Sequence, residues 1–492
     1  MIADESREPE ATIDQIAPEQ ANEGRVGSNI LGLLTSFLES SGNVLLVQGS
    51  PGAGKTTLAF ELLKQVEGPR IGQHSLPPNR LYVSSRISPT RLRKYFPWIN
   101  EVIDSGSGKA VRVGLTEGTN DFQVSQADSI LSKVLNLKHS HQRSLVVIDS
   151  WEGALRNTSE EGRRMLESAV LSQPEESKLS VILVSEGSRT NDLDYLVDGV
   201  VTLSVGQLEG RRTRTLVVNK LRGLRIQTVQ SLFTLDRGRF TLLPETEPVD
   251  SISRKVKVAE PIIHSSTAYS TGSSDLDDML KGGIGKGSSL LLDLDSSVSP
   301  LEMRLLLRII CSNFVNQNGG CFIIPAGTIS SQNVAVALSR CIGDKALKER
   351  VRIAEFNPAL PPEEWRLSLE GKVEQDSLSF ANCWKQLNAV SSSVVLACDF
   401  DKIDQVYGED LFLASLSEMG ASIRDSNALI IGTTSRPTRL RQEFLRVADY
   451  HLKMQDAGGV LVIYGVKPFT NIYGVKFSFQ RGFPMLNLSE IV

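Results

Sequence analysis

The chain has 492 residues, a length that favours two or three domains over a single core. Its 40% hydrophobic and 22% charged residues are typical of a globular protein, and a net charge of −4 argues against a general nucleic-acid-binding protein. No apolar run reaches the ~18 residues that a transmembrane helix needs. Five cysteines without a C-x-x-C pair predict reduced, buried thiols in a cytoplasmic protein.

Residues 1–24 are acidic and polar, which predicts a disordered tail. The first strong pattern is NVLLVQGSPGAGKTTLAFELL at residues 43–63, where an apolar strand runs into a glycine-rich loop and an amphipathic helix. The loop matches the phosphate-binding motif G-x-x-x-x-G-K-[ST] at every fixed position. The predicted nucleotide-binding residues are Gly49, Ser50, Pro51, Gly52, Ala53, Gly54, Lys55, Thr56 and Thr57.

The chemistry of this loop suits a nucleoside triphosphate. Its glycines let backbone amides surround phosphate oxygens, and the helix that follows adds the positive end of its dipole. Lys55 is predicted to reach the β- and γ-phosphates as a catalytic cation, and the Thr56 hydroxyl to hold Mg²⁺. We therefore expect ATP and Mg²⁺ as cofactors. A glycine-rich turn that matches by chance is disfavoured because strand, loop and helix agree.

A second motif, SLVVIDS at residues 144–150, has four apolar residues before Asp149. A carboxylate at the end of such a strand orders the Mg²⁺ shell opposite Thr56, so Asp149 is a predicted metal and nucleotide ligand. The alternative is a helix cap after a buried strand.

Apolar runs alternate with helical patterns from about residue 28 to 205, which predicts an α/β fold with a parallel sheet and helices on both faces. Residues 213–244 look like hairpins that close the edge of this sheet. The predicted strands contain Val44–Val47, Leu81–Ser84, Leu145–Ile148, Val181–Val184 and Val200–Leu203.

The second half repeats this plan after a charged, proline-bearing segment, residues 245–266, that we interpret as a linker. Matching elements lie roughly 245–250 residues apart, an internal duplication at the scale of a domain. We predict an ATP-binding domain at 25–244 and a second domain at 267–492. Its strands contain Leu290–Leu294, Cys321–Ile324, Val394–Ala397 and Leu429–Gly432, with hairpins at 459–479.

No acidic residue occurs from Gly210 to Thr234, a run that contains several arginines and the sequence Lys220-Leu221-Arg222-Gly223. This run has three interpretations: a solvated edge hairpin, an arginine finger, or a basic surface for an acidic partner or nucleic acid. Nearby, Arg86, Arg91, Arg93 and Lys94 precede Tyr95, Phe96 and Trp98; we favour an amphipathic helix with inward aromatics over a docking site.

With these motifs, the first half resembles the KaiC-type ATPases of the RecA superfamily. In that family a K-x-R-G segment lies at the subunit boundary and reaches the neighbouring subunit's nucleotide. The resemblance implies that Lys220 and Arg222 are catalytic in trans and that the chain forms a homo-oligomer, a ring or a dimer, with nucleotide at the subunit interface.

The second half resembles the same family through TAYSTGSSDLDDMLKGGIGKGSSLLL at 267–292, but its phosphate loop is lost. Residues 295–302, DSSVSPLE, replace amide donors and the lysine with acidic side chains and a proline, which repel a triphosphate. Lys467 corresponds to Lys220, while Phe469 stands in place of Arg222. We interpret this half as a degenerate nucleotide site with Asp399 as a structural remnant.

An intact domain followed by a degenerate one resembles a group of archaeal gas-vesicle regulatory proteins, in which the P-loop domain belongs to a repressor that acts through a transcription activator. KaiC-type domains usually carry glutamates after the second strand, where this chain has Ser84-Ser85-Arg86. Glu152 and Glu186 are the nearest substitutes, and Glu152 is our candidate catalytic carboxylate. Losing the usual base costs about 10²–10⁴ in rate, so we predict slow hydrolysis.

Three functions compete. The first is an ATP-dependent assembly switch that acts on a partner protein. The second is an ATPase in DNA recombination or repair. Only the basic run favours it, so DNA is a possible partner without further support. The third is a phosphotransferase like the circadian member of the family, which needs a functional second domain. No membrane partner is expected.

Overall fold

The structure is a computed structural model that describes no residue before Ile30 or between Leu243 and Glu260. The predicted tail at 1–24 and most of the predicted linker lie outside the described residues. The described ranges are 30–40, 42–66, 70–71, 74–75, 79–85, 87–99, 113–117, 126–138, 143–156, 158–171, 178–187, 193–243, 260–327, 329–357, 359–408, 426–480 and 483–492.

The first half builds a nine-stranded sheet in the order β11-β10-β9-β8-β1-β7-β6-β4-β5. Six strands from β8 to β5 run parallel, and β9 to β11 add an antiparallel edge, as the sequence predicts. The strands are β1 (Val44–Gly49), β4 (Asn79–Ser84), β5 (Val113–Glu117), β6 (Ser144–Asp149), β7 (Leu179–Ser185), β8 (Gly199–Leu208), β9 (Arg211–Leu221), β10 (Gln230–Thr234) and β11 (Thr241–Leu242).

Helices cover both faces of this sheet because its central strands are apolar on both sides. Leu45 and Val47 of β1 pack with α1 (Ile30–Glu39) and α2 (Lys55–Gln65), whereas the alternate side chains of β1 face the other layer. That layer contains α5 (Gln126–Lys138), α6 (Trp151–Leu155) and α7 (Glu160–Leu171). Two short helices, α3 (Pro89–Tyr95) and α8 (Leu193–Leu196), and the small hairpin β2 (Arg70–Ile71) with β3 (His74–Ser75) complete this half.

The second half builds a ten-stranded sheet in the order β17-β16-β15-β18-β19-β14-β20-β21-β22-β23. Strands β21 to β23 form its antiparallel edge, and the others run parallel. The strands are β14 (Ser289–Leu294), β15 (Gly320–Ile324), β16 (Val351–Glu355), β17 (Arg366–Ser368), β18 (Val394–Asp399), β19 (Leu429–Thr434), β20 (Tyr450–Asp456), β21 (Leu461–Lys467), β22 (Ile472–Gln480) and β23 (Phe483–Glu490).

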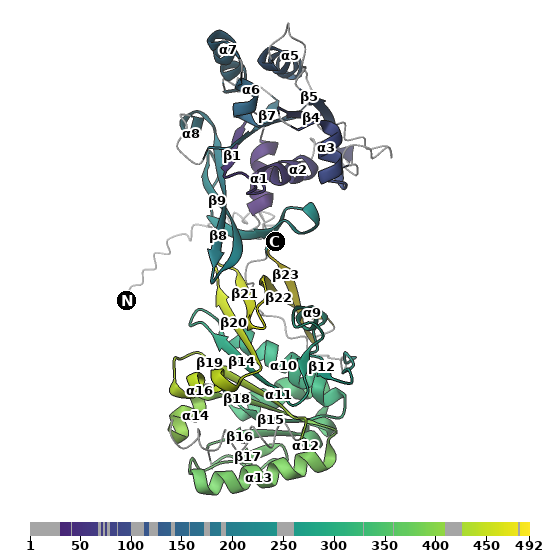
Figure 1. Cartoon of the computed structure of the whole chain (residues 1–492), viewed down its shortest axis with the longest axis vertical. Helices are drawn as coiled ribbons and strands as arrows, with labels where there is room; N and C mark the ends of the chain where they lie inside the picture. The colour runs from purple at the N-terminus through teal and green to yellow at the C-terminus, as the bar shows by residue number, and fades with distance from the viewer. Residues whose placement is uncertain are drawn as a thin grey trace, which may run out of the picture.

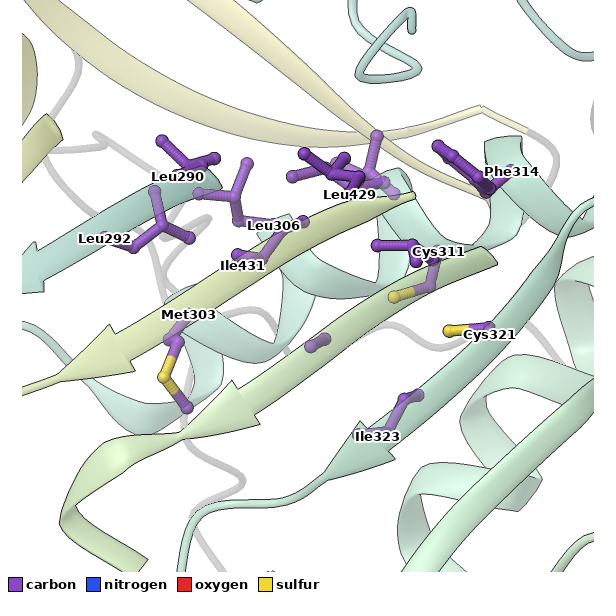
Figure 2. Packing of buried hydrophobic residues seen from close by; sticks show 14 of the residues in the cluster. Leu290, Leu292, Met303, Leu306, Cys311, Phe314, Cys321, Ile323, Leu429 and Ile431 are labelled. Carbon is purple, nitrogen blue, oxygen red and sulfur yellow. The ribbon is translucent and has the colours of Figure 1, made fainter. Parts of the chain in front are cut away.

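Two helical layers enclose the second sheet. In Figure 2, leucines of β14 and β19 pack against Leu306 and Phe314 of the long helix α10, and sulfur-bearing side chains fill the remaining gaps. One layer contains α9 (Ser274–Met279), α10 (Pro300–Asn316), α11 (Ser331–Ile342) and α12 (Asp344–Arg350). The other contains α13 (Val373–Val390), α14 (Phe400–Tyr407) and α16 (Arg439–Val447), and the short pair β12 (Ala268–Tyr269) with β13 (Ile284–Gly285) lies beside α9.

The two halves share one plan down to single hydrogen bonds. The strand order β8-β1-β7-β6-β4-β5 in the first sheet matches β20-β14-β19-β18-β15-β16 in the second. Asp198 accepts a hydrogen bond from the first residue of β1, and Asp449 accepts the same bond from the first residue of β14. Lys220 Nζ donates to Val197 O at 2.6 Å, and Lys467 Nζ donates to Ala448 O at 2.6 Å. The structure thus confirms two tandem α/β units of one architecture.

The halves meet along their antiparallel edges (Figure 1), where β9, β10 and β11 approach β21 to β23. Arg211 is central to this seam: only 4% of it is exposed, and its guanidinium donates to Thr470 O at 2.7 Å and Gly465 O at 2.6 Å. It also stacks on the rings of Tyr464 and Phe469. Part of the basic run is therefore buried between the halves, an arrangement that none of its three interpretations anticipated.

The aromatics at 95–98 only partly follow the prediction that they pack inward. Phe96 and Trp98 pack inward around Phe60, and Trp98 Nε1 donates to Gly238 O at 2.9 Å, whereas Tyr95 is exposed. Arg86 lies outside the described residues. All five cysteines are buried and free, as predicted. None of the described helices has the length and apolar character to cross a membrane.

Candidate nucleotide-binding site

The glycine-rich loop connects the central strand β1 to α2, as the motif requires. Glycine is needed where the backbone has positive φ: Gly52 and Gly54 have φ of 77° and 103°. At Gly49, whose φ is 150°, an added Cβ would lie 2.2 Å from Leu203 O. Nothing lies within 4 Å of the corresponding position at Gly52, so this part of the loop is open to a ligand.

Lys55 begins α2 and points back into the loop. Its Nζ donates to Gly49 O at 2.7 Å and Ser50 O at 3.0 Å, and only 7% of the residue is exposed. A buried ammonium group is costly unless anions or carbonyls surround it. The lysine is therefore already held inside the loop, where phosphate oxygens can replace these carbonyls as its acceptors.

Asp149 at the end of β6 faces Thr56 at the start of α2. The Thr56 hydroxyl donates to Asp149 Oδ2 at 2.6 Å, so the two predicted metal ligands are in contact. The Tyr82 hydroxyl donates to the same oxygen at 2.5 Å, and burial followed by the nearby Asp149 charge raises the pKa of Tyr82 well above its ordinary value. Sequence reasoning did not predict Tyr82 as a site residue. The feature that could have indicated it is a tyrosine in the predicted strand next to the one that ends at Asp149.

These residues fit Mg²⁺ bound with a nucleotide. Mg²⁺ is usually held by one or two protein oxygens, with phosphate oxygens and waters completing its shell. One hydroxyl and one carboxylate converge here beside an open anion-binding loop. No group of three or more histidine, cysteine or acidic residues suited to a metal ion occurs in the described parts of the chain, so the described residues offer no self-sufficient metal cage.

The end of β4, where the resemblance to KaiC-type ATPases implies a carboxylate, holds hydroxyl groups. Ser85 Oγ accepts a hydrogen bond from Ser150 N–H at 2.9 Å, and Ser84 Oγ accepts from Ile87 N–H at 3.1 Å. A serine hydroxyl is too weak a base to take a proton from water at neutral pH. These contacts fix the loop after β4 and add no charge.

Glu152, the substitute carboxylate, lies in α6 near the end of β7. Its Oε1 accepts hydrogen bonds from the Ser185 hydroxyl and from Glu186 N–H, the latter at 3.1 Å. Asp401 in the second half accepts equivalent bonds from the Thr434 hydroxyl and Ser435 N–H. The degenerate half repeats this contact although its phosphate loop is lost. The contact of Glu152 with Ser185 and Glu186 therefore has a structural role, which is to hold α6 against the end of β7.

Lys220 and Arg222 lie away from the loop within their own chain. Lys220 is near the end of β9 that pairs with the start of β8, and Arg222 follows that end, whereas Gly49 pairs with Leu203 further along β8. Arg222 forms an exposed ion pair with Asp198 at 3.1 Å. Desolvation, followed by the charge of Arg222, lowers the pKa of Lys220. A single chain thus does not bring either residue to Lys55.

Arg214, which sequence reasoning did not single out for the site, touches the phosphate loop. Its Nη1 donates to Gly52 O at 3.0 Å, and its Nε donates to Val492 O of the second half. Only 6% of the residue is exposed, and desolvation lowers the pKa of Arg214. The loop is therefore linked through one side chain to the seam between the halves.

The second half has lost its loop, as predicted. Ser299 caps α10 in a capping box with Glu302, so a side chain already accepts the amide that a phosphate would bind. Asp295 Oδ1 accepts from Ser297 N–H at 2.9 Å. Asp399, the counterpart of Asp149, accepts from Lys402 N–H and the Thr433 hydroxyl.

The loop, the buried lysine and the threonine–aspartate pair define a P-loop domain, a class of domain in which this loop serves nucleotide binding. A family model described as "GvpD gas vesicle protein, P-loop domain" matches residues 33–222. The chain is 26% identical over 486 residues to Protein GvpD2 and 23% identical over 525 residues to Protein GvpD1, both of Halobacterium salinarum. Each alignment covers 93% of this chain and 95% of the relative. The chain is thus a P-loop protein with a second α/β half, similar to gas vesicle protein D along nearly its whole length, which confirms the resemblance to gas-vesicle regulatory proteins.

Proposed function

We propose that this protein is an ATP-dependent regulatory switch in which residues 25–244 bind ATP and Mg²⁺ and residues 267–492 form a degenerate partner domain. The observation that carries the proposal is the contact between Thr56 and Asp149 beside the buried Lys55. Lys55, Thr56 and the loop amides would hold the phosphates, and Asp149 would order the metal shell. Bound Mg²⁺ would neutralise part of the phosphate charge.

Hydrolysis in this proposal is slow. The described residues at the end of β4 provide serine hydroxyls in place of the usual carboxylate. Glu152 is the candidate to orient water, although its contacts with Ser185 and Glu186 occupy one of its oxygens. A Glu152→Gln variant tests this role: a further loss of turnover with unchanged ATP affinity supports it, and unchanged turnover leaves Glu152 purely structural.

Assembly is the proposed output of the switch. Lys220 and Arg222 lie at the strand end remote from the loop of their own chain, which suits a role in trans at a neighbouring subunit. Arg222 is exposed enough to exchange Asp198 for a nucleotide phosphate. The assembly would be a ring or a dimer, and its partner in the cytoplasm would be a transcription activator, as in gas-vesicle repression. The likeness to Proteins GvpD1 and GvpD2 supports this partner class.

The DNA-repair alternative receives no support from the described residues. Arg211 and Arg214, two of the cations that motivated it, are buried in the seam. A protein that binds DNA without sequence preference needs exposed cations along a surface. ATP turnover that rises on addition of single-stranded DNA would restore this alternative.

The test is ATP binding, turnover and mass by light scattering on the full chain. Lys55→Ala should abolish tight ATP binding and ATP-dependent assembly, whereas Lys64→Ala, an exposed lysine on the same helix, should behave as wild type. Wild-type turnover should stay below about one per minute, equivalent to a barrier near ~20 kcal/mol. Fast turnover would contradict the proposed regulatory switch and would favour a motor ATPase instead.

A further inference from the structure

The second half contains a cavity of about 360 Å³ that the proposed function does not use. It lies between α10 and α11, against the ends of β15, β18 and β19. Its walls are mostly aliphatic and include Leu301, Leu305, Ile323, Ile329, Val334 and Leu338. Figure 2 shows Met303 and Ile323, two of the lining residues, on α10 and β15. This volume is typical of a small-molecule pocket.

One cation lines this cavity with an unused donor. Arg308 lies in the middle of α10 and is 7% exposed. Its Nε donates to Cys341 Sγ at 3.0 Å, but its Nη2 is buried and, among the described residues, has no hydrogen-bond partner. A buried charged donor without an acceptor is costly because it has lost its hydration, so proteins rarely keep one unused.

The residues around Arg308 do not neutralise it. Burial, opposed by Arg308, raises the pKa of Cys341, so this thiol is uncharged at neutral pH. Asp399 also lines the cavity, but in the described part of the chain it forms no ion pair with Arg308, and its oxygens accept bonds from Lys402 N–H and the Thr433 hydroxyl. The cavity therefore has one buried cation without an anionic partner in its apolar walls.

We propose that this cavity binds an amphipathic carboxylate, with its apolar body between α10 and α11 and its head group on Arg308. A guanidinium can hold a carboxylate through two parallel hydrogen bonds, which suits an anion of one charge. Asp399 in the same wall disfavours a polyanion such as a triphosphate. The aliphatic walls favour a hydrocarbon or aromatic body over a sugar.

The cavity adjoins the lost phosphate loop without including it. Asp399, the counterpart of Asp149, lines the cavity, whereas residues 295–299, where a triphosphate would have met the chain, do not. Arg304 and Arg340 also line it, and the more exposed Arg304 already donates to Pro300 O at 3.2 Å. Binding here would make the degenerate half a sensor of a small acid, independently of ATP at the first half.

The test is calorimetric titration of the full chain with octanoate, compared with octan-1-ol as a neutral analogue. We expect saturable one-to-one binding of octanoate, with octan-1-ol at least about tenfold weaker because a charge-assisted hydrogen bond contributes that much. Arg308→Met should remove this preference for the carboxylate. Arg304→Met, an arginine on the same helix, should change octanoate affinity by less than about threefold.

Three results would overturn the proposal. The first is no saturable octanoate binding at millimolar concentration, and the second is equal loss in both arginine variants, which would indicate general attraction at the rim. The third is loss of octanoate binding in Lys55→Ala, which would place the acid in the phosphate loop. If Arg308→Met does not fold, Ala337→Phe serves instead: a ring in the cavity should abolish octanoate binding while the circular dichroism spectrum is retained.

Discussion

Two aspartates at equivalent strand ends show how one residue changes role when its neighbours change. Asp149 accepts hydrogen bonds from Thr56 and Tyr82. In the second half, Ile323 takes the place of Tyr82. Tyr82 pairs with Val147, two residues before Asp149, and Ile323 pairs with Ala397, two residues before Asp399. Without a hydroxyl there, Asp399 instead caps α14 through Lys402 N–H. A potential metal ligand thereby becomes a helix cap in a nearly dry environment.

Asp399 should cost stability at neutral pH. Burial, only partly offset by the hydrogen bond from Lys402 N–H, raises its pKa to about 6. The pKa of Asp399 in the folded protein lies above its unfolded value of about 3.9. The stability that the protonated carboxyl contributes is therefore fully present below about pH 4 and is lost as pH rises through about 6. Asp399→Asn keeps a capping side chain without the charge. Urea unfolding should show the variant more stable by about 1–3 kcal/mol at pH 7 and similar to wild type at pH 4.

A control strengthens this prediction. Asp401→Asn on the same helix removes a half-exposed carboxylate that bonds Thr434 and Ser435, so it should destabilise the protein at both pH values. If Asp399→Asn is destabilising at pH 7 as well, the aspartate charge is used in the folded protein and the description of Asp399 as a remnant is wrong.

At the scale of elements, the sequence predicted the central strands and the phosphate loop. It did not predict which residues contact each other across the two halves. The runs of four or more apolar residues became the central strands, because a strand covered on both faces must be apolar throughout. The strand β20, with sequence YHLKMQD, escaped notice because polar residues interrupt it near the seam. Arg211 and Arg214 resembled exposed hairpin residues because their partners lie 259 and 278 residues away, beyond any local pattern.

Arg214 makes β9 the element that links the loop to the second half. Arg214→Met keeps the length of the side chain but leaves Gly52 O and Val492 O without this donor. We expect ATP affinity to fall about three- to tenfold and the free energy of unfolding to fall by about 1–3 kcal/mol. Calorimetric ATP titration and urea unfolding measure these effects.

Arg212→Met is the matched control, since Arg212 lies on the exposed face of the same strand. It should leave both quantities within about 0.5 kcal/mol of wild type. Equal effects of the two substitutions would mean that overall charge, and not the contact with Gly52, governs the loop.

At the scale of the whole molecule, the seam decides whether the halves act together. Its apolar cluster draws on both halves and consists of Leu232, Leu243, Val460, Val462, Tyr464, Ile472 and Ile491. Around it, Lys453 pairs with Glu209 at 2.6 Å, and the Thr234 hydroxyl donates to Glu490 O at 2.6 Å. Buried apolar contact and satisfied polar groups are features of a fixed interface between domains, in contrast to a loose one.

The seam predicts that the two halves unfold in one cooperative transition and that ATP stabilises both. Binding to the first half adds about 2.7 kcal/mol when ATP is present at a hundred times its dissociation constant. Leu243 packs against Gly474 of β22, so Leu243→Ser should open the seam. Differential scanning calorimetry should then show two transitions, of which ATP with Mg²⁺ raises only one. Val229→Ser, an exposed position before β10, should keep the single transition. Two independent transitions in the wild-type protein would show that the seam does not couple the stabilities of the two halves. A ligand bound to the second half would then leave the stability of the first half unchanged.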